Sequence, residues 1–282
     1  MHHLRMVVTD LDGTLLKDDK TISPQDLQTL EDLGKNGIIR VIATGRSLKK
    51  VEQVIPPHSP FDYAIFSSGA GIVNWKSKEV LFQKKISGEN TKALVRLFKN
   101  EGLNFKLSDP IPDNDRYYYL FPKPNEETAC YFQTHNPPGI PLESEMNGLN
   151  SSCQFLVFLP SDMDIFQKLR EKVLTLIPGV SIICASSPYL TPYYWMEIFD
   201  KGVSKGHAID WLNRYTGTTH LQTIGVGNDY NDIEMLEHTY HAFITENAPD
   251  ELKLRYRVCP SNEESGFTSA VNATLKNDGM DF

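Results

Sequence analysis

The chain has 282 residues, a length that suits one large domain or two of moderate size. Its formal net charge of −8 at pH 7, with no strongly basic segment to offset it, argues against nucleic acid or an anionic membrane as a partner. The sequence contains neither an apolar run of about 18 residues nor a signal-peptide pattern, so we expect a cytoplasmic protein without a transmembrane helix.

The spacing of the four cysteines is typical of a protein in a reducing compartment. No two of them have the CxxC spacing that is typical of zinc and redox sites. Widely separated cysteines in a cytoplasmic protein are commonly buried free thiols. We therefore expect neither a disulfide nor a zinc site from Cys130, Cys153, Cys184 and Cys259.

Strands and helices alternate in the first part of the chain. Residues 6–9 form a short apolar run with β-branched side chains, which is typical of a buried strand. Ser23 and Pro24 suit the N-cap and first position of a helix, which Gly37 ends. The next expected elements are a strand at 38–43, a helix at 47–55 and a strand at 63–66.

The middle of the chain has a different texture, with longer strands and loops rich in proline and tyrosine. The expected elements are helices at 90–100 and 162–176 and strands at 116–121, 154–159, 181–185 and 193–199. Strands interleaved with two helices indicate an α+β domain whose helices cover one face of a sheet. We expect this domain at 84–200, inserted between the two parts of a core domain at 1–83 and 201–282.

The alternation returns in the last part. We expect helices at 203–214, 230–237 and 267–276, strands at 223–226 and 241–244, a short helix after Pro249 and a short strand at Val258. Alternating strands and helices imply a parallel sheet that is covered on both faces. The expected fold class is therefore α/β, with an inserted α+β domain.

The strongest chemical signal is the sequence Asp-Leu-Asp-Gly-Thr at residues 10–14, directly after the first strand. Ligands of open parallel sheets bind beyond the carboxyl ends of the strands. Of the two carboxylates, one can attack phosphorus and the other can move a proton. A calcium loop of the EF type is disfavoured, because Leu15 and Thr21 stand where it needs glycine and glutamate.

Three weaker signals follow other strands or begin helices, and each has a plain structural alternative. Thr44 and Gly45 can hold a phosphate or simply cap a helix. Lys205, at a helix start where the dipole disfavours cations, can bind an anion or lie in solvent. The Asn/Asp-rich segment at 227–232 offers oxygen ligands for Mg²⁺ or a capping turn.

Together these signals resemble the haloacid dehalogenase-like hydrolase superfamily, and more closely the Cof-type sugar-phosphate phosphatases. The similar segments are 10–14, 43–46, 68–70, 201–206, 227–236, 246–249 and 261–266. Two positions depart from the family pattern, which has asparagine at the place of Ser68 and aspartate at the place of Asn228. In the resembled family the inserted domain is a cap that closes over the active site and selects the substrate.

The resemblance implies a Mg²⁺-dependent phosphatase for a small phosphate ester. We expect a monomer or weak homodimer, although the sequence leaves the oligomeric state open. The resemblance implies Asp10 as the nucleophile and Asp12 as general acid, then general base. It also implies Thr44, the Gly45 backbone and Lys205 as phosphate ligands, and Asp10, the Asp12 carbonyl, Asn228 and Asp232 as the metal site.

Other hypotheses stay open at this point. A phosphomutase of the phosphomannomutase type begins with a similar aspartate loop. A phosphatase for a specialised metabolite, such as a sucrose or glyceryl-sugar phosphate, has the same motifs. Asn228 also allows a catalytically weak phosphate-binding or regulatory protein. An aromatic group in the inserted domain can line a substrate pocket or only pack, namely Tyr117, Tyr118, Tyr119 and Trp195.

Overall fold

The computed structural model describes residues 3–134, 139–142, 150–189 and 192–277. The chain divides into two compact units, which are described separately below. The core unit consists of Met1–Phe82 and Ser204–Phe282, and the inserted unit consists of Gln83–Val203. The boundaries of the inserted unit lie within three residues of the positions 84 and 200 that the sequence predicts.

A sheet of eight strands forms the centre of the core unit, in the order β14-β13-β12-β1-β2-β3-β4-β5. The six strands from β14 to β3 are parallel, as expected, whereas β4 is antiparallel to β3 and extends the sheet at that edge. The strands are β1 (Met6–Thr9), β2 (Ile39–Ala43), β3 (Tyr63–Phe66), β4 (Gly71–Asn74), β5 (Val80–Gln83), β12 (Thr223–Gly227), β13 (His241–Thr245) and β14 (Arg257–Cys259).

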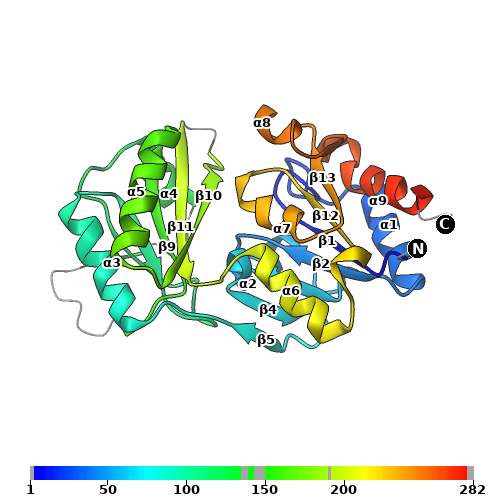
Figure 1. The fold of residues 1–282 in the computed structure, drawn as a ribbon, viewed down its shortest axis with the longest axis horizontal. Coiled ribbons are helices and arrows are strands. Elements are labelled where there is room, and N and C mark those ends of the chain that lie inside the picture. The colour runs from blue at the N-terminus through cyan, green and yellow to red at the C-terminus, as the bar shows by residue number, and fades with distance from the viewer. Residues whose placement is uncertain (1–2, 135–138, 143–149, 190–191, 278–282) are drawn as a thin grey trace. The chain divides into compact units, whose positions relative to one another are not determined.

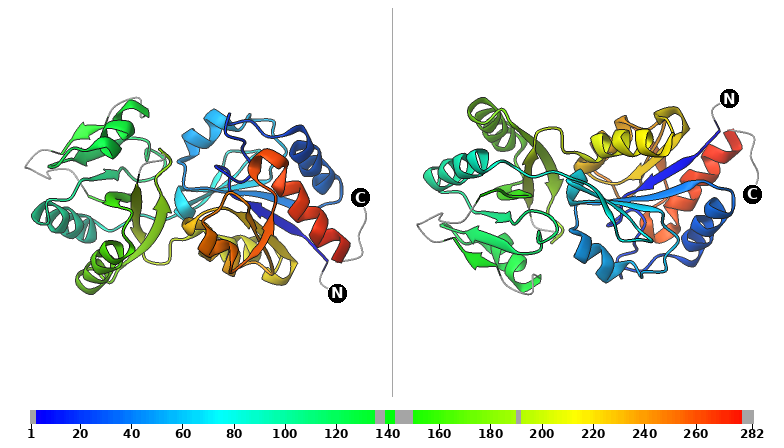
Figure 2. Two further views of the ribbon diagram at one scale, coloured as in Figure 1. Left: turned by 90° about the horizontal axis from the view of Figure 1, so that it is seen from above. Right: turned by 90° about the horizontal axis from the view of Figure 1, so that it is seen from below.

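Helices cover both faces of this sheet. Its described helices are α1 (Pro24–Lys35), α2 (Leu48–Val54), α6 (Lys205–Thr216), α7 (Ile233–Glu237), α8 (Asp250–Lys253) and α9 (Gly266–Asn277). Figures 1 and 2 show α1 and α9 on one face and α6 and α7 on the other. Met6 and Val8 of β1 pack in one apolar cluster with side chains of α6 and α7. All four residues of β1 are buried, as the apolar run at its position predicts.

Local sequence signals explain where the helices begin. The Ser23 side chain accepts a hydrogen bond from the backbone N–H of Asp26, and Pro24 opens α1, as expected from the sequence. Ser204 caps α6 in the same way, so Lys205 becomes the first residue of that helix. The helix expected at 230–237 is a 3₁₀ turn at Tyr230–Asp232 followed by α7.

The inserted unit contains a second sheet, with the order β10-β11-β9-β6-β7-β8. Neighbouring strands are antiparallel except for β7 and β8. The strands are β6 (Phe105–Ser108), β7 (Tyr117–Leu120), β8 (Ile140–Pro141), β9 (Phe155–Pro160), β10 (Val180–Ser186) and β11 (Tyr193–Asp200), and the described helices are α3 (Gly88–Asn100), α4 (Glu126–Thr134) and α5 (Met163–Leu176). The sequence did not predict β6, β8 or α4.

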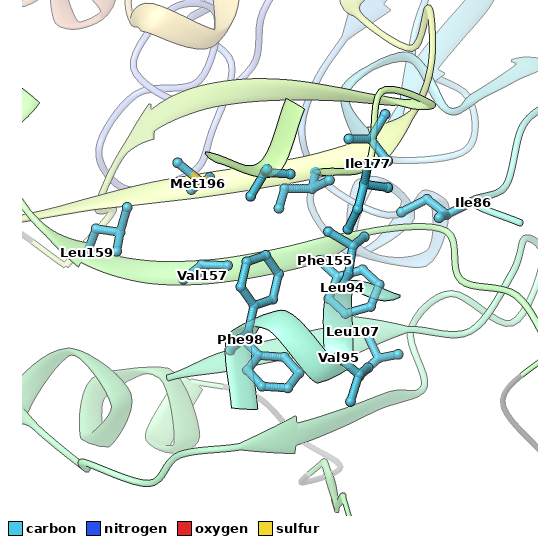
Figure 3. Packing of buried hydrophobic residues seen from close by; sticks show 14 of the residues in the cluster. Ile86, Leu94, Val95, Phe98, Leu107, Phe155, Val157, Leu159, Ile177 and Met196 are labelled. Atoms are coloured by element: carbon cyan, nitrogen blue, oxygen red, sulfur yellow. The ribbon is translucent and has the colours of Figure 1, made fainter. Parts of the chain in front are cut away.

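The helices of the inserted unit lie on both faces of its sheet, so the expectation of one covered face was wrong. Phe155 and Val157 of β9 point to an apolar cluster that includes Leu94 and Phe98 of α3 (Figure 3). Phe158, which has the opposite orientation in β9, packs with Tyr131 of α4 in a separate cluster. The alternation of side chains along a strand thus separates two hydrophobic layers.

The four aromatic residues that could line a pocket or only pack are found in, or packed against, the hydrophobic clusters of the inserted unit. Tyr117 and Trp195 lie in the cluster around Tyr131, with ring centroids 5.7 and 5.9 Å from that ring. Tyr119 packs at the edge of the same cluster, whereas Tyr118 contacts the opposite layer.

The described part of the chain contains no helix with the length and apolar character needed to cross a bilayer. The prediction of free thiols is confirmed, since none of the four cysteines is in a disulfide. Cys153 and Cys259 are buried, while Cys130 and Cys184 are only half-buried.

Candidate active site

The loop at residues 10–14 is held at the carboxyl end of β1 by its neighbours. The backbone N–H of Asp10 donates to the Val226 carbonyl at 2.9 Å, which ties the loop to β12. Gly13 has φ of +74°, and a Cβ there would come within 2.4 Å of the Asn228 amide nitrogen. Glycine therefore permits both the turn and the close approach of the loop that follows β12.

Lys205 joins two aspartates of distant parts of the chain. Its ammonium lies 2.7 Å from Asp10 Oδ1 and 2.6 Å from Asp232 Oδ1. All three side chains are buried, and Lys205 has no exposed surface. The alternative of a solvated lysine at this helix start was therefore wrong.

The cluster contains one ammonium group and two carboxyl groups. Burial lowers the pKa of Lys205, but the two carboxylates outweigh burial and raise it above its ordinary value, so the ammonium stays charged. Burial raises the pKa of Asp10 to about 7, against the opposing effect of Lys205, and Asp232 adds to the rise. One ammonium can balance one carboxylate, so the second carboxylate leaves an excess negative charge that favours a bound cation.

Asp12 has a different environment. Its carboxylate accepts from Arg46 Nε and Nη2 at 2.6 and 2.7 Å and from Lys20 Nζ at 2.9 Å. Burial alone would raise the pKa of Asp12, but Arg46 and Lys20 outweigh it and lower that pKa to about 2. Sequence reasoning missed both partners; Arg46 stands inside the 43–46 segment, whereas nothing in the sequence marks Lys20.

The loop after β12 is built around Asp232. Its Oδ2 accepts from the backbone N–H groups of Asn228 and Asp229 at 2.8 and 3.1 Å, while its Oδ1 faces Lys205. Asn228 Oδ1 accepts from the Thr14 hydroxyl at 3.1 Å, which links this loop to residues 10–14. Both oxygens of Asp232 are thus engaged in holding the loop and the lysine.

Thr44 and Gly45 directly follow β2, which is the strand next to β1 in the sheet. Thr44 is buried, and its hydroxyl accepts from the backbone N–H of Arg46 at 3.2 Å. The N-cap of α2 is Ser47, so Thr44 does not cap that helix. Arg46 connects this segment to Asp12, and through the 10–14 loop to the rest of the site.

The donor set fits a hard divalent cation. Mg²⁺ prefers oxygen ligands, and the Asp10 carboxylate, the Asp12 main-chain carbonyl and the Asn228 amide oxygen would be such ligands. No group of three His, Cys, Asp or Glu side chains in the described ranges is placed to hold a metal. Binding would therefore depend on amide and main-chain oxygens, together with the excess negative charge beside Lys205.

A parallel sheet that carries paired aspartates after its first strand, a buried lysine and an Asn/Asp loop defines a haloacid dehalogenase-type hydrolase. The chain belongs to the haloacid dehalogenase-like hydrolase family, whose model matches residues 7–271. The resemblance found in the sequence is thereby confirmed.

Several known proteins are similar over nearly the whole chain. The 5-amino-6-(5-phospho-D-ribitylamino)uracil phosphatase YwtE of Bacillus subtilis (strain 168) is 24% identical over 298 residues, covering 96% of this chain and 98% of YwtE. The structure of the phosphatase BT1666 from Bacteroides thetaiotaomicron aligns with a TM-score of 0.78 at 21% identity, covering 99% of this chain and 96% of that one. The HAD subclass IIB sugar phosphatase BT4131 aligns with a TM-score of 0.76 at 22% identity, covering 98% and 99%.

Proposed function

We propose that this protein is a Mg²⁺-dependent phosphatase that hydrolyses a small phosphate ester, in particular a sugar or polyol phosphate, through an aspartyl-phosphate on Asp10. The observation that carries the proposal is the buried Asp10–Lys205–Asp232 cluster at the strand ends. A buried carboxylate beside a fixed cation supports a nucleophilic role for Asp10, because phosphoryl transfer needs a positioned nucleophile and a positive charge near the phosphoryl oxygens. The names of the relatives YwtE and BT4131 support the class of substrate.

Asp10 and Asp12 have different roles in the proposed reaction: Asp10 is the nucleophile, and Asp12 transfers protons. Asp10 forms a bond to phosphorus while the bond to the ester oxygen breaks, and the leaving alcohol takes a proton from Asp12. Water then attacks the aspartyl-phosphate, Asp12 accepts its proton, and Asp10 and phosphate are released. Arg46 and Lys20 hold Asp12 in its ionised form, which can accept the proton of the attacking water in the second step. In the first step Asp12 must be protonated, and the negative charge of a bound phosphate dianion favours that protonated form.

The remaining residues bind and orient the phosphoryl group. We assign Lys205, the Thr44 hydroxyl and the Gly45 N–H as its ligands. Asp10, the Asp12 carbonyl and Asn228 would hold Mg²⁺, which neutralises phosphoryl charge when bound. Asp232 contributes by holding Lys205 and the 228–229 backbone, with any contact to the metal made through water. Residues 83–203 are proposed as the cap that selects the ester.

The function is tested by phosphate release from a panel of sugar, polyol and aryl phosphates. We expect turnover with Mg²⁺ and its loss when the metal is removed by a chelator. A protein that releases no phosphate from any ester, or that is indifferent to metal removal, would contradict the proposal. Conversion of a sugar phosphate into an isomer without free phosphate would instead indicate a mutase.

Asn228→Asp is expected to lower the Mg²⁺ concentration for half-maximal activity about tenfold, or about 1.4 kcal/mol. The new carboxylate keeps the acceptor oxygen for Thr14 and adds a negative charge to the metal site. Calorimetric titration of Mg²⁺ should show the same shift without substrate. Asn272→Asp, an exposed change on α9, is the control and should leave the affinity unchanged. Equal or weaker Mg²⁺ binding by Asn228→Asp would exclude residue 228 as a ligand.

A further inference from the structure

Two asparagines from the last part of the core unit donate to main-chain carbonyls of the loop after β1. Asn247 Nδ2 donates to the Gly13 carbonyl at 2.9 Å, and Asn262 Nδ2 donates to the Leu16 carbonyl at 3.0 Å. These partners are 234 and 246 residues apart in the chain. Both asparagines lie in segments that match the family pattern, yet neither is among the residues assigned above to the reaction. Their contacts with the loop therefore need an explanation.

The amide of Asn247 has a defined orientation. Its Oδ1 accepts from the backbone N–H of Asn262 at 3.4 Å, so its Nδ2 faces the Gly13 carbonyl. The reversed amide would bring two acceptor oxygens together on one side and N–H donors together on the other. Asn262 is itself buried, and its side chain also donates to Asp18 Oδ1 at 3.2 Å. This network fixes Asn247 as a donor toward Gly13.

Two donors hold the Gly13 carbonyl. The hydroxyl of Thr245, the last residue of β13, also donates to it at 3.3 Å. Gly13 has φ of +74° and no side chain, so contacts from other segments must restrain the peptide bonds on either side of it. The peptide bond before Gly13 carries the Asp12 carbonyl, which is a proposed Mg²⁺ ligand. Contacts that restrain Gly13 therefore also restrain the direction of that carbonyl.

A second proposed ligand lies against the same glycine. A Cβ at Gly13 would come within 2.4 Å of Asn228 Nδ2 and 3.3 Å of Asn247 Nδ2. The two amides approach Gly13 from the segments that follow β12 and β13, which are neighbours in the sheet. An asparagine that served only its own turn would bond within that turn. Asn247 instead contacts the loop at the residue that joins the Asp12 carbonyl to Asn228.

We propose that Asn247 is a positioning residue for Mg²⁺: by holding the Gly13 carbonyl, it keeps the Asp12 carbonyl in place to bind the metal together with Asn228. Partners that orient metal ligands without contacting the metal are typically worth about 10- to 100-fold in metal affinity. Asn247 acts through a single neutral hydrogen bond to Gly13, so its effect belongs at the lower end of that range. The inference rests on the proposed function and involves only residues of the core unit.

The test is a calorimetric titration of Mg²⁺ into the full-length protein without substrate. Asn247→Ala removes an exposed side chain together with the donor to Gly13, and we expect Mg²⁺ to bind about tenfold more weakly. The Mg²⁺ concentration for half-maximal phosphate release should rise by the same factor. At saturating Mg²⁺, kcat should stay within about twofold of the wild-type value, because the Asp12 carbonyl is then held by the metal in both proteins.

Asn36→Ala is the matched control. Asn36 is also an exposed asparagine of the core unit, and its Nδ2 donates to the main-chain carbonyl of Asp32 in α1 at 2.8 Å. The control should lower thermal stability about as much as Asn247→Ala and leave the Mg²⁺ affinity unchanged. Thr245→Val removes the longer hydrogen bond to Gly13 and should weaken Mg²⁺ binding in the same direction, but less.

Unchanged Mg²⁺ affinity in Asn247→Ala, or an equal loss of affinity in Asn36→Ala, would overturn the inference while the proposed function stands. A fall in kcat that saturating Mg²⁺ does not restore would also overturn it, because the chemical step rather than metal binding would then depend on Asn247. A wild-type protein that binds no Mg²⁺ would overturn the metal dependence of the proposed function, and this inference with it.

Discussion

Asp10→Asn is expected to abolish phosphate release while the protein stays folded. An amide cannot attack phosphorus, and loss of a covalent nucleophile typically costs on the order of 10³-fold or more in turnover. The structure explains why the fold should tolerate the change. Lys205 keeps Asp232 as its partner at 2.6 Å, so the buried ammonium does not lose its only carboxylate. The asparagine also removes the excess negative charge of the cluster.

The measurement is phosphate release at saturating Mg²⁺, with circular dichroism and thermal unfolding to monitor the fold. Asp250→Asn is the matched control, since this aspartate is exposed on the core unit and pairs only with Lys253 among the contacts described. It should retain full activity. Substantial turnover in a pure Asp10→Asn preparation would mean that another group attacks phosphorus.

The sequence could identify the enzyme family because its main signals are local. Residues 10–14 are contiguous, and their place after a buried strand already predicts a ligand-binding loop. Lys205 was detected for a similar reason, as a cation at a helix start that needs an anion nearby. The structure shows that these anions are Asp10 and Asp232, which lie 195 and 27 residues away in the chain. Such pairings depend on the order of the strands and cannot be derived from spacing alone.

The partners of Asp12 show the limit of local reasoning. The sequence marked Arg46 only as the last residue of a Thr-Gly-Arg segment. Its two hydrogen bonds to Asp12 depend on β1 and β2 being neighbours in the sheet. Lys20 contacts Asp12 from a turn in which its own φ is +66°. Positive φ is uncommon for lysine, so the sequence does not predict this conformation. Both residues lower the pKa of Asp12, although neither belongs to the 10–14 segment that the sequence marks most clearly.

The inserted unit was harder to predict because its hydrophobic pattern is mixed. The helix α4 contains Thr128, Cys130 and Phe132, which have only moderate helix propensity. The strand β6 reads as Phe-Lys-Leu-Ser, which suggests one buried and one exposed face. In the structure Lys106 and Ser108 are buried as well, so the pattern alone could not reveal their environment.

The second large effect concerns Lys205→Met. Removing the ammonium leaves Asp10 and Asp232 as two buried carboxylates without a cation, and breaking a buried pair in this way typically costs about 3–5 kcal/mol of unfolding free energy. Activity should also fall by about 10²-fold or more, because a fixed positive charge no longer faces the phosphoryl oxygens. Urea unfolding at neutral pH and phosphate release measure the two losses separately.

The pH dependence identifies the cause of this instability. Without Lys205, the folded-state pKa of Asp10 should lie still further above its unfolded value of about 4, because the ammonium that opposes the effect of burial is gone. A carboxylate with a raised pKa binds more protons when folded, so the variant is least destabilised below about pH 4 and loses stability as pH rises toward neutrality. The double variant Lys205→Met/Asp232→Asn removes one of the two charges, and its amide oxygen can still accept from the Asn228 N–H. It should recover part of the stability at pH 7, because Asp10 stays as a single buried carboxylate instead of one of two, and none of the activity. A single variant that is as stable as the wild type at every pH would show that the three side chains do not form a buried ionic cluster.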